Sequence, residues 1–143
     1  MMVNPKEIRI GNLFNVDGGQ MLRMRVERFF VDEQDRDCAV IGSTSELLQH
    51  RHTCPLSLLE GIPLTEELIE DLGFKWDLVT ATYEFEEIGL IDNGEQGYFA
   101  ILTPRDYLLS VPVPYLHSLQ NLYFYIKGRE MSIKVAHFDE EEL

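Results

Sequence analysis

The chain has 143 residues, a size typical of one domain, and 45% of them are hydrophobic, which is enough to form a packed core. Its 25 acidic and 12 basic residues give a net charge of −13, which disfavours direct binding to nucleic acid and to anionic membranes. No apolar run approaches the ~20 residues of a membrane span, and the first residues lack the apolar segment of a secretory signal. Two cysteines are too few for a disulfide framework, so we expect a cytoplasmic protein with reduced thiols.

The first third of the sequence has the pattern of an antiparallel β-meander. A short apolar segment precedes Asp17-Gly18-Gly19, which is typical of a hairpin turn. Apolar and charged residues then alternate over residues 22–27, as expected for a half-buried strand, and the polar residues 32–37 predict a second turn before a third strand. Residues 8–42 therefore predict a meander, and a small SH3-like barrel is one form that it could take. Residues 43–61 show no clear pattern.

A short helix and a strand are expected in the middle of the chain. Thr65 is a good N-cap, and Gly73 suits the position after the last helical turn. Because so short a helix is not stable alone, it must pack on a sheet. The alternation of apolar and polar residues over 79–86 then predicts a strand with one wet face.

Two more strands and a longer helix complete the predicted fold. Gly94 and Gly97 mark a turn between strands over 88–91 and 98–102, and Pro112 and Pro114 confine the strand over 107–113 to a sheet edge or end it.

From residue 115 to 127 the apolar residues recur at helical spacing, which predicts a helix that Gly128 ends. A final strand over 131–136 and an acidic tail over 139–143 follow.

The predicted fold class is therefore α+β, with an N-terminal antiparallel meander followed by an antiparallel sheet with one short and one longer helix. We expect residues 1–143 to form a single compact domain. Within it, residues 1–61 would be a mostly β subdomain and residues 62–138 an α+β subdomain, because the pattern changes at Gly61.

Three segments of the sequence resemble proteins of one family. They are EIRIGNL at residues 7–13, GIPLTEELIEDLGF at 61–74 and YLHSLQNLYFYIKGREMSI at 115–133. Together they resemble a family of short hypothetical proteins carried by phages and integrated elements of anaerobic gut bacteria. The resemblance covers about a third of the residues but spans most of the chain in order. It implies a mobile-element origin and an intracellular setting, and it implies no activity and no site residues.

His50, His52 and Cys54 form the sharpest candidate for a metal site. In an extended segment these three side chains point the same way, and Cys38 from a neighbouring strand could complete a tetrahedral zinc site. However, the spacing is not that of a zinc finger. The alternative, which we favour, is a polar surface loop with Cys38 buried as a small apolar residue, and it predicts no cofactor.

Polar and aromatic residues of the long helix form a candidate interaction site. His117 and Asn121 lie one turn apart and could share a hydrogen bond or a ligand, although a structural role is favoured. Tyr123, Phe124 and Tyr125 encircle much of the helix, so they cannot all face one core, and such residues are enriched at protein interfaces.

The sequence contains none of the motifs GxGxxG, GxSxG or HExxH and no Walker loop, which removes the common enzyme classes. We predict a non-catalytic interaction module of a phage or mobile element that binds a protein partner or a second copy. One alternative is an acidic decoy that imitates nucleic acid, because residues 37–143 carry the whole net charge. Another is a small zinc-binding protein or enzyme.

Overall fold

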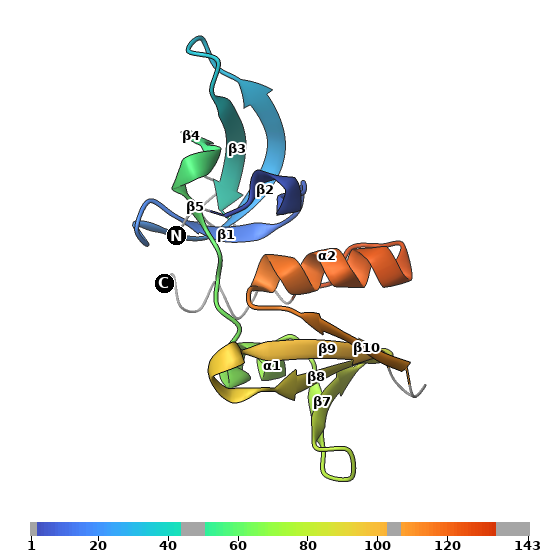
Figure 1. Cartoon of the computed structure of the whole chain (residues 1–143). Coiled ribbons are helices and arrows are strands. Elements are labelled where there is room, and N and C mark those ends of the chain that lie inside the picture. The colour runs from blue at the N-terminus through green and yellow to red at the C-terminus, as the bar shows by residue number, and fades with distance from the viewer. Residues whose placement is uncertain (1–2, 44–50, 103–106, 134–143) are drawn as a thin grey trace. The chain divides into compact units, whose positions relative to one another are not determined.

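The computed structural model describes residues 3–43, 51–102 and 107–133, with the backbone alone for residues 96, 102 and 107–110. Two antiparallel sheets of five strands each, one long helix and one short helix confirm the predicted α+β class (Figure 1). The chain divides into two compact units. Unit 1 comprises Met1–Ile62 and Leu116–Leu143, and unit 2 comprises Pro63–Tyr115.

The sheet of unit 1 is the predicted meander. Its elements are η1 (Pro5–Glu7), β1 (Leu13–Val16), β2 (Met21–Val31), β3 (Asp37–Ser43), β4 (Arg51–Pro55), η2 (Leu56–Leu58) and β5 (Leu59–Glu60). The strand order is β4-β3-β2-β1-β5, because the chain returns after the 3-10 turn η2 to pair β5 with β1. The sheet is thus meander-like, with a helical turn before its last strand.

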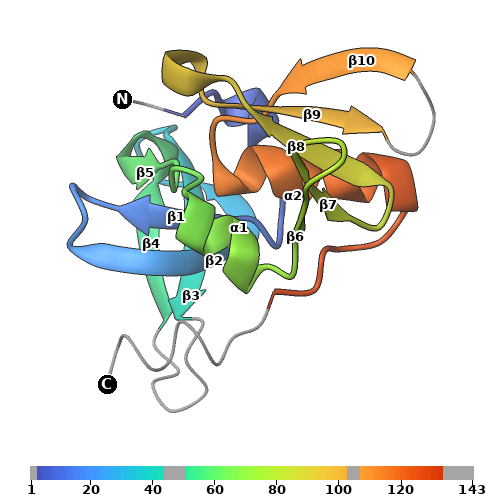
Figure 2. The same cartoon turned by 90° about the horizontal axis from the view of Figure 1, so that it is seen from below.

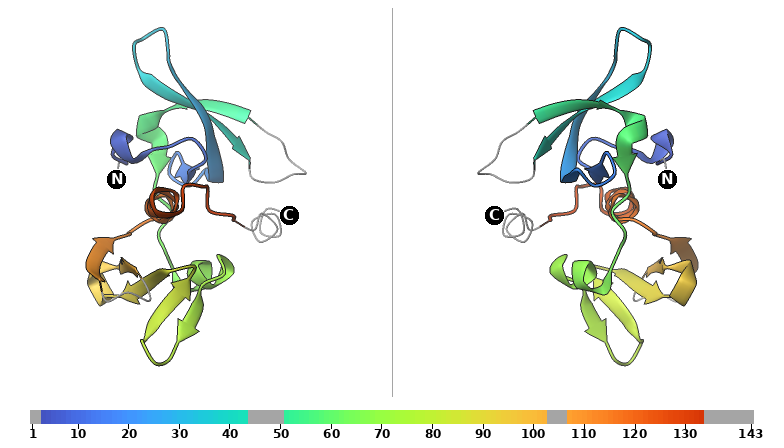
Figure 3. Two further views of the ribbon diagram at one scale, coloured as in Figure 1. Left: turned by 90° about the vertical axis from the view of Figure 1, so that its right-hand side faces the viewer. Right: turned by 90° about the vertical axis from the view of Figure 1, so that its left-hand side faces the viewer.

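The long strand β2 gives the sheet its curvature. Its register with β3 shifts between Val26 and Arg28, which places a bulge at Glu27 and bends the strand. The curved β2–β3 hairpin extends beyond the remaining strands (Figure 3). Beneath the bend lies the core of unit 1, in which Phe14, Val26 and Ile41 are fully buried.

The helix α2 (Leu116–Lys127) completes unit 1. It matches the helix predicted over residues 115–127 and ends before Gly128, whose φ of 71° favours glycine. The helix contacts β1 and η1, whereas the sequence-based subdomains grouped it with the second sheet. Of the strand predicted over 131–136, residues 131–133 have no regular secondary structure, and the rest lie outside the described residues.

Unit 2 is a second meander with a short helix. It contains α1 (Glu66–Asp71), β6 (Lys75–Asp77), β7 (Thr82–Phe85), β8 (Ile88–Asp92), η3 (Gly94–Gln96), β9 (Tyr98–Leu102) and β10 (Tyr107–Pro112). The order is β10-β9-β8-β7-β6, so the strand that ends in Pro112 lies at an edge, as predicted (Figure 2). The Thr65 hydroxyl accepts a hydrogen bond from the Leu68 N–H at 3.2 Å, which confirms the N-cap.

The strand predicted over residues 79–86 is shorter in the structure. Strand β7 begins at Thr82, and residues 78–81 form the turn of a hairpin with β6. Within this turn, the Ala81 N–H donates a 2.8 Å hydrogen bond to the Asp77 carbonyl, and Ala81 has a φ of 56°. The alternation of residue types was therefore wrong as a guide to residues 79–81, because local hydrogen bonds with Asp77 close the chain into a turn.

Candidate interaction site

The turn of the β6–β7 hairpin is ordered by its own hydrogen bonds. The Asp77 carboxylate accepts a 2.8 Å hydrogen bond from the Val79 N–H, and the Asp77 carbonyl accepts one from Ala81. The hydroxyls of Thr80 and Thr82 lie 2.7 Å apart and share a hydrogen bond. These contacts close the turn through hydrogen bonds among residues 77–82.

Large apolar side chains at the end of this hairpin face solvent. Leu78 is 85% exposed and Val79 is 93% exposed, while Trp76 on the adjoining strand is 49% exposed. We call these three residues the apolar tip. The hairpin that carries them projects from its sheet (Figure 3). Single exposed apolar residues are ordinary, but a cluster at a projecting turn is typical of an interaction surface.

The base of the hairpin is fixed within unit 2. The rings of Trp76 and Tyr83 meet edge to face, with centroids 5.0 Å apart. The Tyr83 hydroxyl donates a 2.6 Å hydrogen bond to the Glu66 carboxylate on α1, and this bond raises the pKa of Tyr83 above its usual range. The phenol therefore stays protonated at neutral pH, and it ties the hairpin to the helix.

One acidic residue adjoins the apolar tip. Asp77 ends β6 directly before the turn, whereas Glu84 lies opposite Lys75 and residues 86–87 form the turn at the other end of β7. Unit 2 as a whole has eleven acidic and two basic residues in its sequence. Asp77 and the net acidic charge of unit 2 therefore disfavour contact of this hairpin with an acidic surface.

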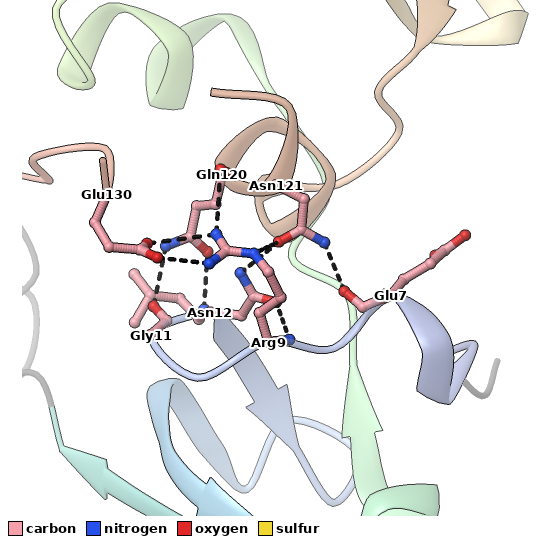
Figure 4. Close-up of polar contacts among 8 residues, drawn as sticks. Glu7, Arg9, Gly11, Asn12, Gln120, Asn121 and Glu130 are labelled. Atoms are coloured by element: carbon pink, nitrogen blue, oxygen red, sulfur yellow. Dashed lines mark hydrogen bonds and ion pairs between the residues drawn. The ribbon is translucent and has the colours of Figure 1, made fainter. Parts of the chain in front are cut away.

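Asn121, which the sequence proposed as an interaction residue, instead belongs to a polar network inside unit 1 (Figure 4). Its side-chain oxygen accepts hydrogen bonds from Arg9 Nε at 2.8 Å and Asn12 Nδ2 at 2.9 Å. Its side-chain nitrogen donates to the Glu7 carbonyl at 2.6 Å. This arrangement supports the structural role that the sequence analysis favoured for the residue.

The predicted aromatic residues of α2 have three different environments. Tyr123 is buried, and its hydroxyl accepts a 3.0 Å hydrogen bond from Arg129. Phe124 is partly exposed under the guanidinium of Arg9, which lies 4.3 Å from its ring centroid and also pairs with Glu130. Tyr125 is 87% exposed, so it is the member of the set that a partner reaches most easily.

His117 is fully buried at the start of α2. Its ring lies 4.7 Å from that of Phe14, and its Nε2 atom is 3.9 Å from the largely exposed Glu7 carboxylate. Burial lowers the pKa of His117 from 6.5 to about 4. The buried imidazole is therefore neutral at pH 7.

The stability of the protein should fall in mild acid because of His117. The unfolded chain takes up a proton at this residue near pH 6.5, whereas the folded chain resists protonation down to about pH 4. The stability that comes from this pKa difference is fully present above pH 6.5 and is lost as the pH falls from 6.5 to about 4. We therefore expect the free energy of unfolding to fall by about 2 kcal/mol between pH 7 and pH 5. Urea unfolding at the two pH values measures it.

A His117→Gln variant is the matched control for this pH dependence, because glutamine does not titrate. The variant should lose about 2 kcal/mol less than the wild type between pH 7 and pH 5. An equal pH dependence in the two proteins would assign the effect to carboxylates and contradict the role of His117.

The structure separates the residues of the predicted zinc site. In the register of β3 with β4, Cys54 lies opposite Ala39 and Cys38 lies opposite Pro55, so the two thiols point to opposite faces of the sheet. Cys54 belongs to the core, His52 is exposed, and His50 lies outside the described residues. The described residues contain no group of three metal-binding side chains.

The thiols themselves are not activated. Burial raises the pKa of Cys54, and burial together with the nearby Asp32 carboxylate raises the pKa of Cys38. Both are therefore protonated at neutral pH. Cys38 is buried, as the favoured alternative predicted, but the surface loop of that alternative is wrong for residues 51–55, because pairing with β3 makes them strand β4.

No known protein family, no curated protein and no solved structure matches the chain. In the part of the chain that the structure describes, neither helix is long and apolar enough to cross a membrane. Among the described residues, Leu78 and Val79 of the apolar tip are the most exposed large apolar side chains apart from Tyr125. The sequence analysis missed the apolar tip, because Asp77 is the one turn-favouring residue there and residues 79–86 alternate like a strand.

Proposed function

We propose that this protein is a non-catalytic interaction module of a phage or other mobile element, and that it binds a protein partner through the apolar tip of the β6–β7 hairpin. The observation that carries the proposal is the exposure of Leu78 and Val79 in a turn held by its own hydrogen bonds. The mobile-element setting is supported by the resemblance of segments 7–13, 61–74 and 115–133.

The energetics of the tip favour binding. Full burial of a Leu or Val side chain in a partner contributes about 1.5–3 kcal/mol. Because hydrogen bonds to Asp77 already order the turn, little backbone entropy is lost on docking. Asp77 beside the tip and the acidic composition of unit 2 disfavour acidic surfaces and favour a partner with a basic group beside an apolar depression.

The test compares the wild type with a Leu78→Ser/Val79→Ser variant. Each tagged protein is incubated with lysate of an anaerobic gut bacterium, washed at low and high salt, and its bound proteins are quantified by mass spectrometry. We expect a stoichiometric partner that resists high salt and that the variant loses by tenfold or more. The free energy of unfolding should change by less than about 0.5 kcal/mol, because both side chains are exposed.

Two control variants locate the interface. Leu22→Ser removes another exposed apolar side chain, from unit 1, and should retain the partner. Tyr125→Ala tests the aromatic face of α2, which the sequence analysis proposed as the interaction site. If the tip variant still binds the partner and Tyr125→Ala does not, the result would contradict binding through the apolar tip and assign it to α2.

The acidic decoy remains a second candidate because of the charge of unit 2, with its eleven acidic and two basic residues. A decoy binds basic nucleic-acid-binding proteins through many exposed charges, which salt screens strongly. Bound proteins of this class that leave at high salt, and that the tip variant retains, would favour the decoy over the apolar tip.

A further inference from the structure

The core-facing side of the β2–β3 hairpin continues beyond the covered core of unit 1. Phe29 lies opposite the core residue Ala39, and Val31 lies opposite Asp37, two residues further along each strand. Directly opposed residues share a face, so Phe29 and Val31 extend the apolar side of the sheet. Nevertheless Phe29 is 41% exposed and Val31 is 60% exposed.

A pocket of about 390 Å³ occupies this uncovered end of the core, within the range of 300–1,000 Å³ typical of ligand sites. Pro5 and Ile8, in and after η1, form part of its wall, and Leu56 at the start of η2 forms another part. Phe30 and Cys38 also line it, although their side chains belong to the other face of the hairpin. On the core-facing side the lining is therefore apolar apart from the carboxylate of Asp37.

The charged group in the lining is Asp37, at the start of β3. The turn that joins the two strands adds three carboxylates and one guanidinium, from Asp32, Glu33, Asp35 and Arg36. Arg36 is already paired with Asp32 at 2.8 Å, so the charge beside the pocket is negative. An occupant therefore gains from a positive charge next to its apolar part.

We propose that this pocket binds a segment of a protein partner in which an apolar side chain enters the pocket and a neighbouring lysine or arginine pairs with Asp37. An extended segment suits the site because Phe29 and Val31 leave an open apolar strip along the strand, beyond the pocket itself. The apolar tip of a second copy fits less well, since it would bring Asp77 towards Asp37. The site lies in unit 1 and is independent of the tip in unit 2.

The test uses three blocked tetrapeptides, Gly-Phe-Lys-Gly, Gly-Phe-Glu-Gly and Gly-Ser-Lys-Gly, titrated into isotopically labelled protein. Amide chemical shifts of residues 29–31 and 38 report on the pocket. We expect saturable shifts with the Phe-Lys peptide at millimolar concentration, about fivefold weaker binding of the Phe-Glu peptide, and none of the Ser-Lys peptide.

Variants separate the two parts of the proposal. Asp37→Asn should remove the difference between the Phe-Lys and Phe-Glu peptides, and Val31→Ser should weaken both. Val79→Ser, a matched change at the tip of unit 2, should alter neither. Equal binding of the Ser-Lys and Phe-Lys peptides would contradict binding of an apolar side chain in the pocket. Equal binding of the Phe-Glu and Phe-Lys peptides to the wild type would contradict the role of Asp37.

Discussion

Replacing Leu119 with aspartate is expected to destabilise the protein by about 4 kcal/mol or more, the largest effect of any single change considered for this chain. Leu119 is fully buried on α2, on the apolar stripe that the sequence predicted. The variant loses the packing of the leucine and places a carboxylate where water does not reach. Urea unfolding at pH 7, followed by circular dichroism, measures the loss.

A Tyr125→Asp variant is the control, since it introduces the same side chain into the same helix at an 87% exposed position. It should change the free energy of unfolding by less than about 0.5 kcal/mol beyond the small difference in helix propensity. Similar losses of unfolding free energy in the two variants would show that an aspartate anywhere in the helix is destabilising, and that the burial of Leu119 is not the cause.

A Gln120→Leu variant is expected to lose about 3 kcal/mol, although leucine is the more hydrophobic residue. The side-chain oxygen of buried Gln120 accepts a 2.9 Å hydrogen bond from the Leu13 N–H. Its nitrogen donates to the Gly11 carbonyl at 3.1 Å (Figure 4). Leucine leaves both backbone groups without these partners, and each buried group so left costs about 1–3 kcal/mol. Thermal and urea unfolding provide the measurement.

The matched control for this change is Tyr125→Leu on the exposed side of α2, which should be nearly neutral. A loss below about 1 kcal/mol in Gln120→Leu would mean that water replaces the missing amide. In that case the network would contribute little to the link between the helix and the first strand.

The helix α2 was predictable because its information is local. The apolar spacing over residues 115–127 and the glycine at position 128 specify its extent, and Thr65 similarly specifies the start of α1. The β6–β7 turn was not recognised because residues 79–86 alternate like a strand. There, two hydrogen bonds to Asp77 outweigh the pattern of residue types.

The polar network of unit 1 could not be read from the sequence, since Arg9 and Asn12 lie more than a hundred positions before Asn121. Nothing local indicates that such distant residues meet. The members of the network come from segments 7–13 and 115–133, at the two ends of the described chain.

The chain enters unit 2 at Pro63 and leaves it at Tyr115, and these two residues are neighbours in space. The Leu116 N–H donates a 2.8 Å hydrogen bond to the Ile62 carbonyl, and Pro63 and Tyr115 form the adjacent β-bridge. Unit 2 is thus an insertion between β5 and α2. During synthesis, the first sheet therefore emerges without the helix that supplies Gln120 and Asn121. Since domains fold as units from the N-terminus, the inserted unit is the first to be complete on the ribosome.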